Sequence, residues 1–135
     1  MAHRPEVLKS FVPLYGAIMG PGTVERRTKE LVYLACSFVN QCQYCLSAHQ
    51  ASGKKAGITE DEMTALREAR NESFTPSEQA AISYARELTR SANSQTSGAD
   101  LEAHFNAAQT VEITLIAAMA NFTNRFNNGL GVMPE

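Results

Sequence analysis

The sequence predicts an all-α fold, a compact bundle of about six helices with no sheet, folded as a single domain over residues 1–135. Apolar residues recur every three or four positions along most of the chain, which is the spacing of amphipathic helices. A hydroxyl residue with an acid three places later marks helix starts at Thr59, Thr75 and Ser97. No run of alternating apolar and polar residues between turn signals favours a strand.

We expect helices over residues 5–19, 24–38, 42–56, 60–70, 76–91, 100–107 and 110–127. Gly-Pro-Gly at residues 20–22 separates the first two, and Thr23 is expected to cap the second. Asn40 and Gln41 predict a turn before the third helix, because the apolar stripe lapses there. Gly57 is expected to end the third helix with a positive φ, which glycine adopts without steric cost.

The fourth and fifth helices have the clearest start signals. Glu62 follows Thr59, and Glu78 follows Thr75, at the spacing of a capping box, in which each side chain bonds to the other residue's backbone N–H. Pro76 suits the first position of the fifth helix, because a backbone N–H has no partner inside the helix there. These two boundaries are therefore expected to be sharp.

Composition limits the class of protein. A chain of 135 residues with 44% hydrophobic content can form one core and is short for two domains. Its formal net charge of −2 leaves no basic surplus, so neither nucleic acid nor an anionic membrane is expected as a partner. No stretch of about 18 apolar residues occurs, and three cysteines are too few for a secreted disulfide framework. We expect a soluble, cytoplasmic protein.

Cys42, Cys45 and His49 are the reactive side chains that lie closest together in the sequence. Two cysteines separated by two residues can close a small disulfide ring or bind a metal ion. A zinc ion would need a fourth ligand, and the candidates are Glu30, Cys36 and His104. The residues alone leave three readings open: a redox pair, a structural zinc site, and an oligomeric interaction module without catalysis.

A helical hairpin through the predicted turn brings Glu30 to this group. Glu30 lies ten residues before the turn and His49 eight after it, so at 1.5 Å per residue both lie about 12 to 15 Å from the turn. Cys45 is four residues before His49 and therefore on the same helix face. The predicted order along the site is Glu30, His49, Cys45, Cys42.

This order suits thiol chemistry. A thiolate is the nucleophile, and a free cysteine with a pKa of about 8.5 is mostly protonated at neutral pH. Free N–H groups at a helix N-terminus favour the thiolate, and His49 one turn away can accept its proton. Glu30 would hold the imidazole in one tautomer and stabilise its charged form. After the attack, the second cysteine can close a disulfide.

The pattern E-x11-C-x2-C-x3-H, formed by Glu30, Cys42, Cys45 and His49, resembles the active-site motif of the alkylhydroperoxidase AhpD-like proteins in the carboxymuconolactone decarboxylase superfamily. The resemblance spans most of the chain and includes the late segment at residues 124–131. It implies a small all-α domain that assembles into homo-oligomers, trimers or hexamers. It also implies peroxidase or disulfide reductase activity in antioxidant defence, on a hydroperoxide substrate, without metal, haem or another cofactor.

By the same resemblance, Cys45 is the thiol that attacks the peroxide, and Cys42 is the resolving partner and disulfide-exchange site. His49 accepts the proton and Glu30 heads the relay. The expected reductant is a thiol or dithiol, such as a lipoylated or thioredoxin-like protein. Tyr44 stands where AhpD itself has a histidine. Lactone decarboxylation is not expected, because the decarboxylase branch normally lacks the CxxC pair.

Residues outside the motif receive simpler interpretations. Cys36 lies among apolar residues and is expected to be a buried free thiol. Arg26 and Arg27 are expected to be exposed. Tyr44 could contact a substrate or a neighbouring subunit. The apolar faces of the Glu30 helix and of the C-terminal helix are expected to pack against another subunit.

Overall fold

The computed structural model describes residues 1–135 and contains seven α-helices and no strand. In chain order the helices are α1 (Pro5–Met19), α2 (Arg26–Asn40), α3 (Gln43–Lys55), α4 (Glu60–Arg67), α5 (Pro76–Ser91), α6 (Gly98–His104) and α7 (Ala107–Gly129). The predicted all-α fold is confirmed. The turn before α3 and the end after it are also as predicted, with φ of 53° at Gln41 and 91° at Gly57.

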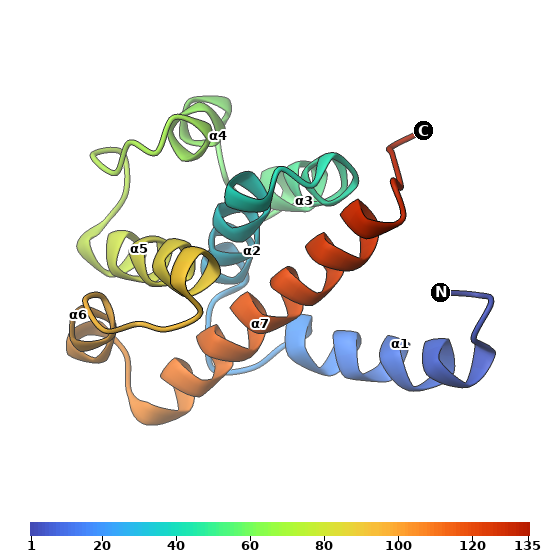
Figure 1. The fold of residues 1–135 in the computed structure, drawn as a ribbon. Coiled ribbons are helices and arrows are strands. Elements are labelled where there is room, and N and C mark those ends of the chain that lie inside the picture. The colour runs from blue at the N-terminus through green and yellow to red at the C-terminus, as the bar shows by residue number, and fades with distance from the viewer.

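Helix α2 is the centre of the fold, where α3, α4, α5 and α7 all contact it (Figure 1). Residues 28–37 of α2 are all buried, including the charged side chains of Lys29 and Glu30. A buried charge needs a close partner, so these two residues must each be bound by another part of the chain. The burial leaves α2 no free apolar face for another subunit, contrary to the prediction.

Capping boxes start three of the helices. Those predicted at Thr59 and Thr75 are confirmed at the starts of α4 and α5. Asn106 forms a third box at the start of α7, which a search for hydroxyl residues could not find. Ser97 does not cap α6, because its hydroxyl donates to Glu87 at 2.8 Å instead. The predicted cap at Ser97 is therefore wrong, although the helix α6 does begin at the next residue.

Thr23 does not cap α2, which begins at Arg26. The backbone N–H and the hydroxyl of Thr23 both donate to the carboxylate of Glu112 on α7. The ammonium of Lys29 lies 2.6 Å from the same carboxylate. An added Cβ at Gly22 would lie 2.0 Å from Glu112 Oε1, so a side chain there would push the carboxylate away. Glycine at this position lets the loop between α1 and α2 close against α7.

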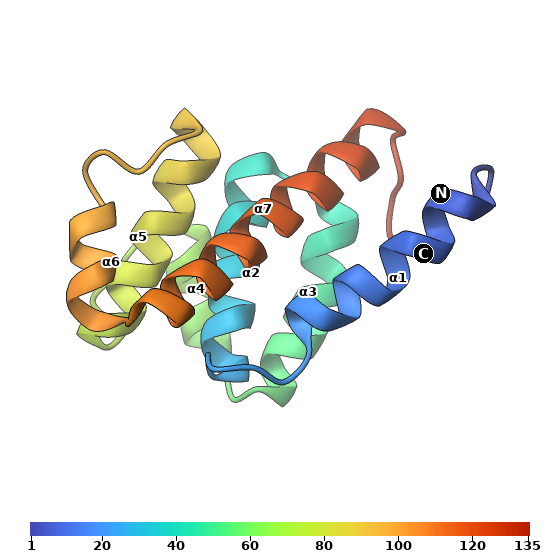
Figure 2. The same cartoon turned by 90° about the horizontal axis from the view of Figure 1, so that it is seen from below.

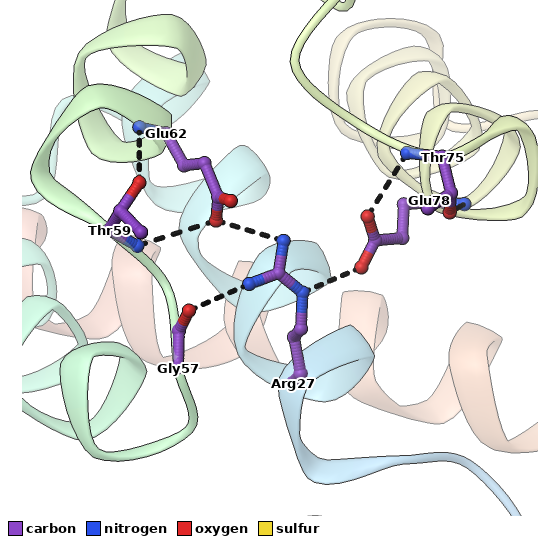
Figure 3. Close-up of polar contacts among 6 residues, drawn as sticks. All are labelled: Arg27, Gly57, Thr59, Glu62, Thr75 and Glu78. Atoms are coloured by element: carbon purple, nitrogen blue, oxygen red, sulfur yellow. Dashed lines mark hydrogen bonds and ion pairs between the residues drawn. The ribbon is translucent and has the colours of Figure 1, made fainter.

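Arg27 joins the starts of α2, α4 and α5 (Figure 3). Its guanidinium lies 2.8 Å from Glu62 and 2.7 Å from Glu78, and it donates to the Gly57 carbonyl at 2.8 Å. Both glutamates also belong to capping boxes. The prediction of an exposed Arg27 is wrong, because its side chain is 24% exposed and bound on three sides. We call these four residues the Arg27 junction.

Helix α1 extends away from the bundle and packs against α7 (Figure 2). Several apolar side chains of these two helices remain exposed, namely Val12, Leu14, Val111, Leu115 and Phe122. None of the seven helices combines the length and the apolar character that crossing a membrane requires.

Candidate active site

Asparagines of α7 hold the segment that leads into α3. The Asn128 amide donates to the carbonyl of Asn40, the last residue of α2, at 2.8 Å. The Asn40 side chain in turn donates to Asn121 and Asn124, at 3.0 Å each. Carbonyls at a helix end have no partner inside the helix, and Asn128 satisfies one of them. These bonds fix the point at which the chain turns through Gln41 into α3.

Cys42 and Cys45 form a disulfide at the start of α3, with their Cα atoms 5.3 Å apart. Cys42 is the N-cap residue, and its sulfur accepts the backbone N–H of Cys45 at 3.3 Å. The side-chain amide of Asn127, on α7, donates to Cys45 Sγ at 3.4 Å. A donor of this kind stabilises a thiolate more than a thiol, and Asn127 is positioned to supply it to Cys45.

Glu30 and His49 meet across the α2–α3 hairpin, as the hairpin geometry predicts. Glu30 Oε2 lies 2.8 Å from His49 Nδ1, and the two residues are 5% and 7% exposed. An ionised carboxylate only accepts hydrogen bonds, so Nδ1 carries a proton and Nε2 of a neutral ring is the acceptor. The Tyr33 ring stacks on the imidazole with centroids 3.6 Å apart. Glu30 and Tyr33 together fix the orientation of His49.

Tyr15, from α1, contacts the other ring nitrogen of His49. Its hydroxyl lies 3.1 Å from Nε2, 34 positions away in the sequence. Sequence reasoning missed this residue, because spacing within the α2–α3 hairpin says nothing about where α1 packs. The available signal was a tyrosine on the apolar stripe of α1. Burial, and then the negative charge of Glu30, raises the pKa of Tyr15, so its hydroxyl stays protonated at neutral pH.

Cys45 and His49 line a cavity of about 480 Å³, here called the sulfur-side cavity. Its walls are mostly hydrophobic, and their aromatic members are Phe11, Tyr15, Tyr33, Tyr44 and Phe126. Cys42 is fully buried and is not on this wall. A small molecule that enters the cavity therefore meets the sulfur of Cys45 and not that of Cys42.

A second cavity of about 590 Å³ lies on the other side of the acid–histidine pair, and we call it the Glu30-side cavity. Glu30, Arg26 and Lys29 are on its wall, so it is more polar than the first. Tyr15 and His49 are the two residues that line both cavities. They therefore form the partition between the reactive sulfur and the buried carboxylate.

The structure brings the four predicted site residues together as two pairs. Glu30 is bound to His49 and Cys42 is bound to Cys45, but in this disulfide state His49 bonds to neither sulfur. The other ring nitrogen of His49, Nε2, contacts the Tyr15 hydroxyl instead. No group of three or more His, Cys, Asp or Glu side chains is arranged to hold a metal ion.

Cys36 is a buried free thiol, as predicted. Its sulfur lies 3.8 Å from the carbonyl of Ala85, within the core between α2 and α5. Burial raises the pKa of Cys36 to about 11, so this thiol stays protonated at neutral pH and is a poor nucleophile. The third cysteine is therefore separate from the site in both place and chemistry.

Comparison with known proteins assigns the chain to a family. The sequence model of the carboxymuconolactone decarboxylase family matches residues 5–87, which is more than half of the chain. An uncharacterized protein of Bacillus subtilis (strain 168), YdfG, is 27% identical over 114 residues, or 81% of this chain and 77% of the relative.

Two solved structures share the fold. A protein of unknown function from Agrobacterium tumefaciens, suggested to be the antioxidant defence protein AhpD, superposes with a TM-score of 0.88 at 24% identity, over 97% of this chain and 92% of that one. A cysteine-to-alanine variant of the debrominase Bmp8, in complex with 2,3,4-tribromopyrrole, has a TM-score of 0.88 at 19% identity, over 100% and 74% of the two chains. A debrominase and a suggested antioxidant defence protein thus share this fold. The chain belongs to the carboxymuconolactone decarboxylase family and has the AhpD-like fold.

Proposed function

We propose that this protein is an alkylhydroperoxidase-like enzyme, a thiol-dependent hydroperoxidase or disulfide reductase in which Cys42 and Cys45 alternate between a dithiol and a disulfide. The observation that carries the proposal is the position of Cys45, at the start of α3 and on the wall of an apolar cavity that His49 also lines. The description of the Agrobacterium protein as an antioxidant defence protein agrees with this function.

The proposed cycle balances with one hydroperoxide and one dithiol. The Cys45 thiolate attacks the outer oxygen of the hydroperoxide, so that an S–O bond forms and the O–O bond breaks. The leaving oxygen takes one proton to give an alcohol, and Cys45 becomes a sulfenic acid. The Cys42 thiol then attacks the Cys45 sulfur, closes the disulfide and releases water. An external dithiol supplies two electrons and two protons to restore both thiols.

The positions of the two sulfurs support different roles for them. Cys45 lines the sulfur-side cavity and accepts a hydrogen bond from Asn127, which suits the attacking thiol. Cys42 lies directly behind it with no exposed surface, which suits a resolving thiol. Exchange of the disulfide at Cys42 stays a prediction, since an incoming thiol would reach Cys45 first. It would require the start of α3 to open.

Glu30 and His49 are proposed to accept the proton of the Cys45 thiol, with His49 as the base and Glu30 as its partner. Glu30 holds the proton on Nδ1, which leaves Nε2 as the basic nitrogen of His49, on a residue that lines the same cavity as Cys45. The carboxylate also stabilises the imidazolium that forms when Nε2 takes a proton. General base assistance of this kind is typically worth a factor of about 10² to 10⁴ in rate.

Tyr44 is a proposed contact for the substrate or the reductant. It lines the sulfur-side cavity, and 44% of the residue is exposed, so it reaches both the cavity and the surface. The reductant is proposed to be a thiol or dithiol carrier, such as a lipoylated or thioredoxin-like protein. A cytoplasmic location fits this chemistry, because thiol pools there reduce disulfides such as the one that closes the proposed cycle.

A homo-oligomer, trimer or hexamer, is also part of the proposal. The exposed apolar side chains of α1 and α7, such as Leu14, Leu115 and Phe122, would be covered by another copy of the chain. Light scattering on the purified protein tests this part separately. A monomer at micromolar concentration would exclude it.

Hydroperoxide turnover tests the main proposal. Wild-type protein with an excess of dithiothreitol should consume tert-butyl hydroperoxide, and Cys45→Ser should reduce consumption to the uncatalysed rate. Cys36→Ser is the matched control, because Cys36 lies outside the site and the Ala85 carbonyl can accept the new hydroxyl. Equal turnover by wild-type protein and Cys45→Ser would end the assignment.

The alternative of a structural zinc site or a non-catalytic module makes an opposite prediction. Mass spectrometry of the native protein would then find stoichiometric zinc, and thiol titration would find Cys42 and Cys45 unreactive. Our proposal predicts that Cys45 titrates rapidly after reduction, that the buried Cys42 reacts more slowly, and that Cys36 reacts only after unfolding.

A further inference from the structure

The hydroxyl of Tyr15 occupies the one atom of His49 that could act as a base. Nδ1 gives its proton to Glu30 at 2.8 Å, so Nε2 has the free lone pair, and its partner at 3.1 Å is the Tyr15 hydroxyl. A ring nitrogen without a proton can only accept, so Tyr15 is the donor in this bond. The basic nitrogen therefore faces a phenol rather than a thiol.

The contact between Tyr15 and His49 lies between two cavities. Tyr15 and His49 form the partition between the sulfur-side cavity, which Cys45 lines, and the Glu30-side cavity. Cys45, Tyr15 and His49 all lie on the wall of the sulfur-side cavity, so a proton that leaves the Cys45 thiol for the imidazole can pass along this wall. The Tyr15 oxygen is the group on the wall of that cavity already bonded to Nε2.

From this arrangement we infer that Tyr15 is a proton-relay residue between Cys45 and His49. The inference rests on the proposed thiol chemistry and adds a member that neither the motif nor its spacing contains. As the Cys45 S–H bond breaks, its proton passes to the Tyr15 oxygen, directly or through one cavity water. In the same step the Tyr15 O–H proton passes to Nε2 of His49. The products are a Cys45 thiolate, an unchanged phenol and an imidazolium bound to Glu30.

The return step uses the same route in reverse. When the hydroperoxide O–O bond breaks, the imidazolium gives its Nε2 proton to the Tyr15 oxygen, and the phenol gives its own proton to the leaving alkoxide. Tyr15 thus gains one proton and loses one proton in each of the two steps, the forward transfer and the return transfer. It is neutral at the end of each step. No further oxidant or reductant is needed for this transfer.

The surroundings keep Tyr15 in the form that the relay needs. The groups that face it are His49 on α3, and Glu30 and Tyr33 on α2, with Arg26 and Lys29 farther along the Glu30-side cavity. From α7, the residues on the wall of the sulfur-side cavity are the uncharged Thr123, Phe126 and Asn127. Burial, and then the negative charge of the Glu30 carboxylate, raises the pKa of Tyr15, which disfavours a phenolate and keeps the hydroxyl as a donor.

Tyr33 provides a matched control. It lies on the same cavity wall and its ring stacks on His49 at 3.6 Å, but its hydroxyl bonds to Thr123 and not to the imidazole. Tyr15→Phe and Tyr33→Phe each remove one buried phenol oxygen near His49. Only the first removes the group bonded to Nε2, so a general effect of losing a hydroxyl can be separated from loss of the relay.

The test measures thiol ionisation without any peroxide. The reduced protein is alkylated with iodoacetamide over a range of pH, and tandem mass spectrometry follows the rate at Cys45. At the end of the transfer the Tyr15 hydroxyl accepts from the imidazolium and donates to the thiolate, so it also stabilises this ion pair. Without that bridge the thiolate is less stable, and we expect Tyr15→Phe to move the midpoint of the profile up by about one pH unit, which is a tenfold loss of rate at neutral pH. Tyr33→Phe should leave the midpoint within about 0.3 unit, a twofold rate change. An unchanged profile in Tyr15→Phe, or equal shifts in both variants, would overturn the inference.

A second measurement needs no variant. Nitrogen NMR of His49 in the wild-type protein at neutral pH should find the proton on Nδ1 and an unprotonated Nε2. A ring protonated on Nε2 and bare on Nδ1 could not accept from Tyr15 and would refute the relay even if Tyr15→Phe failed to fold. Both measurements are independent of hydroperoxide turnover, so the relay and the proposed function can fail separately.

Discussion

The Arg27 junction and the Glu30–His49 pair begin three residues apart on α2, yet their surroundings differ. Arg27 is bound by two carboxylates and a carbonyl, and both carboxylates also cap helices (Figure 3). The Glu30–His49 pair ends instead in a phenol hydroxyl and separates two cavities.

The difference teaches how to tell a structural acid–base group from a reactive one. In the Arg27 junction, a proton could be moved only by breaking bonds that hold the starts of α2, α4 and α5 together. At His49, a proton can be added to Nε2 while the Glu30 bond is kept and strengthened. Substitutions on the Arg27 side should therefore change stability, and substitutions on the His49 side should change reactivity.

The largest effect is expected on the reactive side, at the resolving thiol. Cys42→Ser should react once with hydroperoxide and then stop, because no second thiol can close the disulfide. A sulfenic acid should remain on Cys45 and be captured by dimedone, which mass spectrometry detects. Sustained turnover by Cys42→Ser in a reductant that does not resolve sulfenic acids would show that Cys42 has another role.

His49→Ala is expected to lower the hydroperoxide rate at neutral pH about a hundredfold, because the Cys45 proton loses its acceptor. The rate should recover as the pH is raised, since hydroxide can then ionise the thiol. A pH–rate profile of the variant measures both effects. A rate profile that matches wild type at every pH would remove His49 from the mechanism.

Arg27→Ala should produce the opposite pattern. It leaves two partly buried carboxylates without their partner, and we expect a loss of about 2 to 3 kcal/mol in the free energy of unfolding. Denaturant unfolding measures this loss. Turnover per folded molecule should be unchanged. Arg26→Ala is the matched control, because Arg26 is exposed and should change stability by less than about 0.5 kcal/mol.

Stability should also fall at acid pH. Burial alone raises the pKa of Glu78, but the hydrogen bond and charge of Arg27 and the bonds from Thr75 together outweigh it, and the net pKa is lowered. At Glu112 the bonds from Lys29 and Thr23 likewise outweigh burial. Unfolded glutamate titrates at a pKa of about 4.3, so this stabilisation is complete above that pH and is lost as the pH falls further.

Thermal unfolding between pH 7 and pH 3 measures this loss. The drop should be smaller in Arg27→Ala, because Glu78 no longer has its main partner there. An equal drop in both proteins would mean that other carboxylates control acid unfolding.

The sequence predicts what depends on local spacing. The caps at Thr59 and Thr75, the turn at Gln41 and the meeting of Glu30 with His49 all follow from helical periodicity over a short stretch. Where α1 and α7 pack cannot be obtained in this way. Tyr15 and Asn127 reach the site from those two helices, and nothing in the spacing of the motif points to them.

The same limit explains the errors. Thr23 has a capping residue's chemistry, but Glu112 on the distant α7 competes successfully for its N–H and hydroxyl. The prediction of an exposed Arg27 is wrong because its partners lie 35 and 51 positions later in the sequence, where helical spacing cannot reveal them. Tertiary partners decided these positions, and a single sequence does not specify which partners meet.

The central claim is that Cys42 and Cys45 form a disulfide that a hydroperoxide creates and a dithiol opens. The direct measurement is to treat the fully reduced wild-type protein with one equivalent of tert-butyl hydroperoxide and map its thiols by mass spectrometry. We predict a Cys42–Cys45 disulfide in place of both thiols, one equivalent of tert-butanol, and Cys36 still reduced. Unchanged thiols and unconsumed hydroperoxide would contradict the claim.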